Sequence, residues 1–312
     1  RGSAVRIIDQ VVNQGTGAKV IDKKVKTYII FDRVHKTKVE VFKFMGKTLY
    51  LECYSGISGD MTVGALLDLG ADKAVLDRVL QSLPVSGFQI KTGKVVKSGI
   101  AACDFDVMLD ENHENHDHDM EYLHGHGHTH THSHGHETEH LHMHRGIQEI
   151  QEIIQKADMS RRAKKIASRI FEILADAEAK VHGVPKEQVH FHEVGAVDSI
   201  VDIISAAVCL DNLDITDVVV PVLYEGCGTV RCQHGILPIP VPAVANVISE
   251  NHLCIKVTAV EGELVTPTGA AIVAAIRTKD KLPEEFEIKK IGIGAGKRQY
   301  ECPGILRAMI IS

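Results

Sequence analysis

The chain has 312 residues, of which 44% are hydrophobic and 24% are charged, and its formal net charge at pH 7 is -6. This composition is that of a globular protein with a buried core, and the acidic balance gives no support for binding nucleic acid or an anionic membrane surface. No apolar run approaches the roughly 20 residues of a membrane span and no signal-peptide pattern is present, so we predict a cytoplasmic protein. Seven cysteines occur without a Cys-x-x-Cys pair, which argues against a disulfide framework or a structural zinc knuckle.

The first 44 residues carry two β-type runs, at 27–31 and 39–42, and no pattern that indicates chemistry. Met45-Gly46-Lys47 directly precedes a clean strand pattern and has the form of an alternative start. We therefore interpret 1–44 as an appended segment of unknown role and 45–312 as the main domain.

A strand is predicted at 47–54 and an apolar helix at 60–69, with a turn of small residues between them. Small residues let the backbone approach a ligand, and amides at a helix start attract anions, although an ordinary strand-to-helix turn explains the pattern equally well. Asp60 is placed to cap the helix, to hold a metal or to act in catalysis. The candidate phosphate-binding residues of this turn are Ser55, Gly56, Ser58 and Gly59.

A second helix at 73–83 and a hairpin at 88–109 around Ser98-Gly99 follow. Because the strand pairs are not regularly separated by helices, the order predicts an α+β fold, a mixed sheet with packed helices in layers, rather than a doubly wound sheet.

The composition changes abruptly at 113–144, where thirteen of 32 residues are histidine. The segment has almost no apolar residues to bury, so we predict a long disordered His-rich loop that interrupts the domain at 110–144. Imidazoles are mostly neutral near pH 7 and bind nickel or zinc, which predicts a metal reservoir. The alternating run supplies the metal candidates His124, His126, His128, His130, His132, His134 and His136.

Helices are predicted at 145–157 and 160–182, the second closed by Gly183 and Pro185. In the next stretch, 190–202, two histidines lie two residues apart and two aspartates lie four residues apart. If a strand is followed by a helix here, both imidazoles leave one side of the strand and both carboxylates lie on one face of the helix, so the two kinds of side chain can meet. Nitrogen and oxygen donors together suit zinc, nickel or iron better than calcium. The metal-ligand candidates are His190, His192, Glu193, Asp198 and Asp202. A hydrogen-bonded core histidine, a helix cap and a solvated carboxylate are the alternative interpretation.

After a helix that continues to about residue 213, a buried strand is predicted at 218–223 and a helix at 243–249. His234 lies in a proline-rich loop between them and is a catalytic candidate, with a structural turn as the alternative. Thr266-Pro267-Thr268-Gly269 has the form of an anion-accepting helix start, for which capping alone is also sufficient, and supplies the binding candidates Thr266, Thr268 and Gly269. The run 291–297 is glycine-rich but leads to a strand at 305–311, so it is not a dinucleotide-binding loop.

These motifs, in this order, resemble the LarC family of nickel insertion proteins. The resemblance rests on 55–61, the His-rich insertion, 190–202, the His234-Gly235-x-Leu237-Pro238-x-Pro240 pattern, 266–269, and Gly292-x-Gly294-x-Gly296 with Leu306-Arg307. It covers about 45–312. Glu52-Cys53-Tyr54 departs from the acidic-small-Phe pattern expected before Ser55.

The resemblance implies a CTP-dependent nickel cyclometallase, of the lyase class. Such a protein inserts nickel into pyridinium-3,5-bisthiocarboxylic acid mononucleotide to make the nickel-pincer nucleotide cofactor of lactate racemase. Nickel, CTP with manganese or magnesium, and apo lactate racemase downstream are then the expected partners, and a homo-oligomer is compatible with the sequence. The resemblance also implies a C-terminal portion, associated with CTP, beyond residue 312. A nickel storage or delivery protein without chemistry and a metal-dependent phosphoesterase are the alternatives.

Overall fold

The computed structural model describes the backbone of 19–20, 27–31 and 38–42 and, in more detail, 46–110, 145–191, 197–232 and 234–312, with only the backbone of His190. The chain divides into two compact units, Arg1–Gly46 and Lys47–Ser312. In the first unit, β1 (Lys19–Val20), β2 (Thr27–Phe31) and β3 (Lys38–Phe42) form an antiparallel sheet in that order. Two of these strands were predicted. The His-rich loop was predicted at 110–144, and all of it except Asp110 lies outside the described residues.

The second unit contains helices and strands whose bounds are as follows. The helices are α2 (Gly59–Asp68), α3 (Lys73–Gln81), α5 (Ile147–Lys156), α6 (Arg161–His182), η2 (Lys186–Gln188), α7 (Val197–Asn212), α8 (Pro242–Glu250) and α9 (Pro267–Ile276). The strands are β4 (Lys47–Glu52), β5 (Phe88–Lys97), β6 (Ile100–Leu109), β7 (Arg145–Gly146), β8 (His190–Phe191), β9 (Ile215–Val219), β10 (Leu223–Cys227), β11 (Thr229–Cys232), β12 (Gly235–Pro238), β13 (Ile255–Glu261), β14 (Ile288–Ala295) and β15 (Ile305–Ile311).

The main sheet has the strand order β5-β6-β14-β15-β4-β9. β14 pairs with β15 and β15 with β4 in antiparallel fashion, whereas β14 pairs with β6 and β4 with β9 in parallel. The sheet is therefore mixed, and the predicted α+β fold class is confirmed. The hairpin turn at Ser98 and Gly99 is also confirmed, with φ angles of 48° and 82° that match the twist of the two strands.

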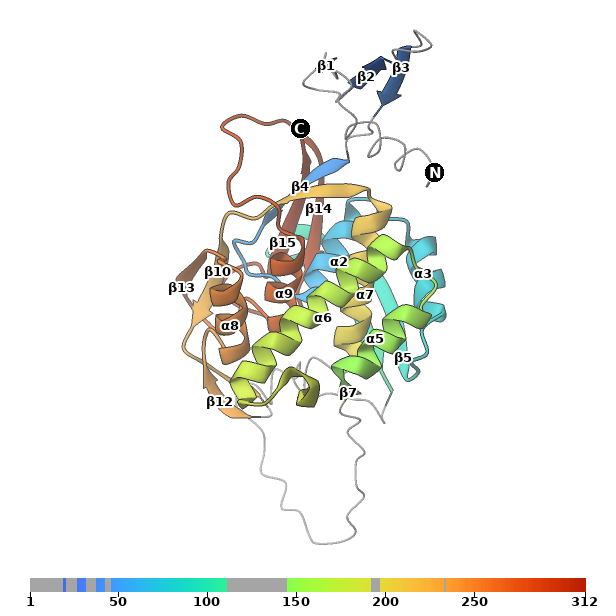
Figure 1. Cartoon of the computed structure of the whole chain (residues 1–312). Coiled ribbons are helices and arrows are strands. Elements are labelled where there is room, and N and C mark those ends of the chain that lie inside the picture. Colours follow the sequence, from blue (N-terminus) through green and yellow to red (C-terminus); the bar gives the residue numbers. More distant parts are fainter. Residues whose placement is uncertain are drawn as a thin grey trace, which may run out of the picture. The chain divides into compact units, whose positions relative to one another are not determined.

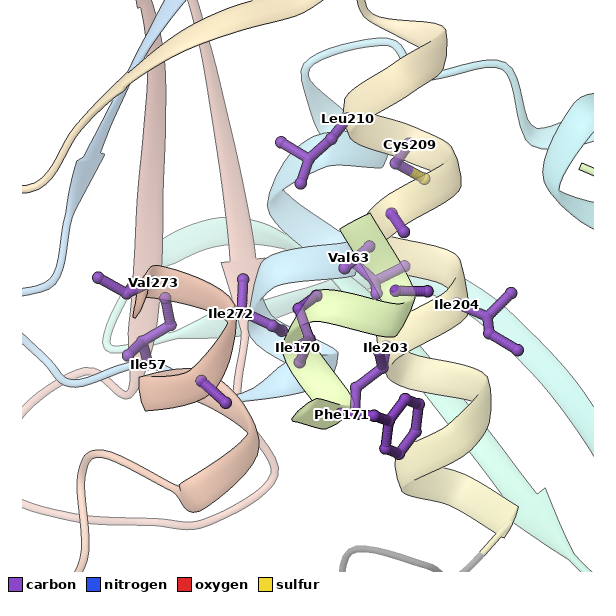
Figure 2. Close-up of a cluster of buried hydrophobic side chains, with 14 of the residues drawn as sticks. Ile57, Val63, Ile170, Phe171, Ile203, Ile204, Cys209, Leu210, Ile272 and Val273 are labelled. Carbon is purple, nitrogen blue, oxygen red and sulfur yellow. The ribbon is translucent and has the colours of Figure 1, made fainter. Parts of the chain in front are cut away.

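Helices form layers on the sheet (Figure 1). Helix α2 packs on β14, β6 and β15, α7 packs on α2, and α6 packs on α7, α8 and α9. The core between these helices is aliphatic, and Figure 2 shows Val63 of α2, Ile170 of α6, Ile203 of α7 and Ile272 of α9 directed into it. All four side chains are fully buried. Burying each of them stabilises the fold by roughly 1.5–3 kcal/mol.

Helix α2 lies very close to β14, because two glycines of that strand face it. A Cβ on Gly294 would lie 1.9 Å from the backbone oxygen of Met61, and one on Gly292 would lie 2.3 Å from that of Ala65. Any side chain there would push the helix off the sheet. The glycine-rich run at the end of β14 therefore serves close packing, in agreement with our rejection of a dinucleotide loop.

The helix ends that the sequence predicts are formed by specific backbone and side-chain interactions. Ser160 accepts from the backbone N–H of Ala163 at 3.0 Å at the start of α6, and Gly183 ends that helix at φ 65°. Several predicted boundaries differ from the observed ones by one or two residues, and one predicted strand was wrong. The strand predicted at 218–223 is interrupted, with β9 ending at Val219 and β10 beginning at Leu223, because Pro221 between them has no N–H to donate. Within the described parts of the chain, every helix is too short or too polar to cross a bilayer.

Candidate functional site

Two loops that precede helices α2 and α9 are bonded to each other. The backbone N–H of Ile57 donates to the oxygen of Leu264 at 3.0 Å, and the N–H of Thr266 donates to the oxygen of Ile57 at 3.1 Å. A Cβ on Gly56 would lie 2.0 Å from the oxygen of Leu264, and one on Gly269 would lie 2.2 Å from that of Ile57. These glycines let the loops touch, so the two predicted phosphate-binding turns form one surface.

The predicted binding residues of these turns differ in accessibility. Thr266 caps α9, accepting from the N–H of Gly269 at 3.1 Å, and Thr268 is buried. A small cavity of about 50 Å³ is bordered by the side chains of Ser55, Ser58 and Thr266 and by residues of 296–304. Its lining residues are Ser55, Ser58, Asp60, Met61, Glu263, Leu264, Thr266, Gly296, Lys297, Arg298, Tyr300 and Gly304.

Three predicted carboxylates converge beside this cavity. Asp60 lies in the first turn of α2, where the Ser58 hydroxyl donates to it, and Asp198 and Asp202 lie on α7 as predicted. Asp202 is packed tightly, since a Cβ on Gly59 would lie 2.4 Å from its Oδ2. Burial raises the pKa of Asp202 well above its usual value, and the charges of Asp60 and Asp198 raise it further. The ionised form of this cluster needs a compensating positive charge.

A cation that lines the small cavity comes from the segment 291–297, which our sequence interpretation set aside. Lys297 pairs with Asp104 at 2.6 Å and with Asp106 at 3.2 Å. Burial lowers the pKa of Lys297, but these two carboxylates outweigh it and the pKa is raised. The same lysine also lowers the pKa of Asp202. The sequence feature that could have identified Lys297 is its position directly after the glycine-rich end of β14.

Arg298 and Glu263 form a buried ion pair between the small cavity and a larger one. Arg298 Nη1 lies 2.6 Å from Glu263 Oε2, and the Tyr300 hydroxyl donates to the Glu263 backbone oxygen at 2.9 Å. The side chains of Arg298 and Glu263 are only 16% and 7% exposed. Both residues line both cavities.

The larger cavity has a volume of about 220 Å³ and lies among α6, the β11–β12 hairpin, α8 and the start of α9. Its lining residues are Glu178, Val181, His182, Val230, Arg231, Cys232, His234, Leu237, Val241, Pro242, Ala243, Glu263, Pro267 and Arg298. The predicted catalytic residues Asp60 and His234 therefore lie on different cavities. His182 and Cys232, which the sequence interpretation did not select, lie with His234.

The loop before α9 is held by a buried carboxylate. Glu225 of β10 is fully buried, and its Oε1 accepts from the backbone N–H groups of Gly226 at 2.8 Å, Leu264 at 2.8 Å and Val265 at 3.1 Å. Its Oε2 has no hydrogen-bond partner among the described residues. Burial raises its pKa to about 7, against the lowering effect of the three N–H donors.

The metal candidates at 190–193 are placed only in part. His190 pairs through its backbone with Gly146 in β8, while His192 and Glu193 lie outside the described residues, as do the histidines of 124–136. Among residues that the structure describes, no group of three or more His, Cys, Asp and Glu side chains is arranged to hold a metal ion. The complete ligand set proposed from the sequence stays a prediction.

Comparison with known proteins places this geometry in context. The family model described as "Nickel insertion protein" matches residues 49–312. A protein of Alkaliphilus metalliredigens, named pyridinium-3,5-bisthiocarboxylic acid mononucleotide nickel insertion protein, is 56% identical over 268 residues, which are 86% of this chain and 61% of the relative. Proteins of the same name from Clostridium acetobutylicum and Geobacillus kaustophilus are 44% and 41% identical over 85% of this chain and cover 64% and 59% of their own lengths. The chain thus spans about three fifths of the curated relatives it matches. No solved structure matches it.

Proposed function

Because the chain belongs to the nickel insertion protein family, we propose that it inserts nickel into pyridinium-3,5-bisthiocarboxylic acid mononucleotide. The observation that carries this proposal is the family match over 49–312, which includes every element around the two cavities. Nickel is then a substrate that passes through the protein.

The chemistry of that nucleotide defines what the protein must do. Its name specifies a pyridinium ring with thiocarboxylates at positions 3 and 5, so one ring carbon lies between two sulfur-bearing groups. Nickel that binds both sulfurs also replaces the hydrogen of that carbon, and one proton is released for each nickel–carbon bond formed. The protein must therefore hold a phosphate, hold the metal and accept a proton.

We assign the first two of these tasks to the predicted residues. The surface formed by 55–60 and 266–269 would hold phosphate, because hydroxyls and helix-start amides suit an anion. The carboxylates Asp60, Asp198 and Asp202, with His190, His192 and Glu193, would hold nickel or a nucleotide-bound divalent ion. The histidines of the His-rich segment would raise the local nickel concentration without trapping it.

The finer reaction is a CTP-dependent cyclometallation of the lyase class, with magnesium or manganese accompanying CTP. Its product would be the nickel-pincer nucleotide of lactate racemase. Nucleotide substrates and CTP are supplied inside cells, which supports a cytoplasmic location.

The test is an incorporation assay with this chain, the nucleotide, nickel, CTP and magnesium or manganese. Mass spectrometry measures the nucleotide after nickel replaces a proton, chromatography measures CTP loss, and the longer Alkaliphilus metalliredigens relative is the positive control. We expect nickel incorporation that depends on CTP. Nickel bound without product would favour storage or delivery, and release of phosphate without nickel would favour a phosphoesterase.

A further inference from the structure

An exposed aromatic side chain lies next to the surface that would hold phosphate. Tyr54 and Ser55 are the two central residues of a turn in which the backbone N–H of Gly56 donates to the oxygen of Cys53 at 3.2 Å. Ser55 lines the small cavity, whereas the side chain of Tyr54 is 53% exposed. Such turn positions usually carry small or polar residues, so the turn itself does not explain an exposed aromatic ring there.

A second tyrosine holds the first in place. The backbone N–H of Tyr224 in β10 donates to the same Cys53 oxygen at 3.2 Å. The ring centroids of Tyr54 and Tyr224 are 4.7 Å apart at an interplanar angle of 56°, which is a stabilising distance for an aromatic pair. Lys256 pairs with Tyr224 across β10 and β13 and places its Nζ 5.0 Å from the centroid of the Tyr224 ring. We call Tyr54, Tyr224 and Lys256 the aromatic patch.

The chemistry of the aromatic patch suits a flat ring with a positive charge. The face of a tyrosine ring carries negative charge density and attracts cations, and flat rings stack on it. Lys256 is exposed and can pair with an acid group attached to such a ring. A pyridinium ring with acid groups at positions 3 and 5 combines both features.

The position of the aromatic patch matches the construction of a mononucleotide. A ribose separates the ring of a mononucleotide from its phosphate, so the two must bind to neighbouring but distinct groups. Tyr54 and Ser55 are consecutive, with Cα atoms about 3.8 Å apart, and of the two only Ser55 lines the small cavity. We propose that the pyridinium ring of the nucleotide substrate stacks on Tyr54, with Lys256 pairing with an acid group of the ring. This inference deepens the proposed function and rests on it.

The test is isothermal titration calorimetry on the full chain in the presence of a metal chelator. The probe is nicotinic acid mononucleotide, a pyridinium nucleotide with one ring carboxylate. We expect Tyr54→Ala to weaken its binding about tenfold, as is typical when an aromatic stacking partner is removed. Tyr54→Leu should do the same, although it keeps apolar volume against Tyr224. Tyr54→Phe keeps the ring, so this matched control should bind within about twofold of the unaltered chain.

Two further ligands separate the contributions of ring and phosphate. Ribose 5-phosphate has no ring, so it should bind equally to the unaltered chain and to Tyr54→Ala, and this equality also shows that the turn keeps its fold. Nicotinamide mononucleotide carries a neutral amide in place of the carboxylate. Lys256→Gln should therefore weaken binding of nicotinic acid mononucleotide and leave binding of nicotinamide mononucleotide unchanged.

Equal binding of nicotinic acid mononucleotide by the unaltered chain and by Tyr54→Ala, or no binding by the unaltered chain, would overturn the proposal. So would a loss in Tyr54→Ala that is confined to cytidine monophosphate, because the aromatic patch would then hold the base of CTP. The titration needs neither nickel nor CTP. Tyr54-dependent binding without nickel incorporation would count against the proposed function alone, and incorporation with Tyr54-independent binding would count against this inference alone.

Discussion

The two cavities share Glu263 and Arg298 but offer different donor atoms. The smaller one is bordered by hydroxyls and by Asp60, with Asp202 close by, whereas the larger one carries two imidazoles and a thiol. Oxygen donors suit phosphate-bound magnesium or manganese, and nitrogen and sulfur donors suit nickel. The two cavities therefore present different donor atoms while sharing one ion pair.

The two cavities are also built differently. The smaller one depends on backbone contacts between two loops, which Gly56 and Gly269 permit. The larger one depends on side chains brought by the end of α6 and by a short hairpin. Substitutions at the smaller cavity should therefore affect stability more strongly than those at the larger one.

The largest effect is expected from Arg298→Ala, because this residue belongs to both cavities. The variant leaves the Glu263 carboxylate buried without its partner, which typically costs about 3–5 kcal/mol of unfolding free energy. Urea denaturation measures the loss. The double variant Glu263→Gln with Arg298→Met should recover part of it, since no buried charge is then left unpaired.

Arg307→Ala is the matched control. Arg307 also pairs with a carboxylate, Glu52, but its side chain is 46% exposed, so solvent screening limits the loss to roughly 1 kcal/mol or less. Equal losses in Arg298→Ala and Arg307→Ala would mean that the boundary between the cavities is not held by a buried pair.

A smaller effect is expected from the pH dependence of Glu225, which anchors the loop of the smaller cavity. Its pKa is about 7 when folded against 4.5 for an ordinary glutamate, so the folded state binds the proton more tightly. Its contribution to stability is thus fully present below pH 4.5, falls as pH rises to 7 and is constant above. The shift corresponds to about 3 kcal/mol.

Urea unfolding from pH 4.5 to 8 measures this effect as the difference between the unaltered chain and Glu225→Gln. The amide oxygen can still accept from the three N–H groups but does not titrate, so the variant should lose less stability over this range. Parallel pH profiles for the two proteins would contradict a raised pKa at Glu225.

The sequence predicted the carboxylates beside the smaller cavity better than the side chains that line the larger one. Asp198 and Asp202 are four residues apart in an apolar helix, and Asp60 follows a turn of small residues, so their positions on helices could be inferred from local patterns. Their convergence could not, because it depends on how α2 packs against α7.

The unpredicted residues are those whose neighbours are distant along the chain. His182 was predicted only as the end of a helix, and only the tertiary fold brings it to His234, whereas Cys232 is two residues from His234 along the chain. Lys297 and Arg298 were not predicted for a related reason. The glycines before them let α2 pack closely on the sheet, and no local sequence pattern indicates that contact.

The smallest change in stability, but one of informative sign, is expected from Asp202→Asn. Because burial and two neighbouring carboxylates raise the pKa of Asp202 in the folded state, this residue weakens stability increasingly as pH rises above 3.8. Removing its charge should raise the free energy of unfolding by about 0.5–2 kcal/mol at pH 8, in the presence of a metal chelator. The same substitution should abolish nickel incorporation. Asp211→Asn is the contrasting control, since Asp211 accepts from Ser160 at 2.6 Å and pairs with Arg162, and its loss should destabilise the chain. A gain in stability together with a loss of activity would indicate that Asp202 serves function and not folding. If Asp202→Asn instead unfolded more easily than the unaltered chain, Asp202 would be a structural carboxylate, and its proposed role as a metal ligand would lose this support.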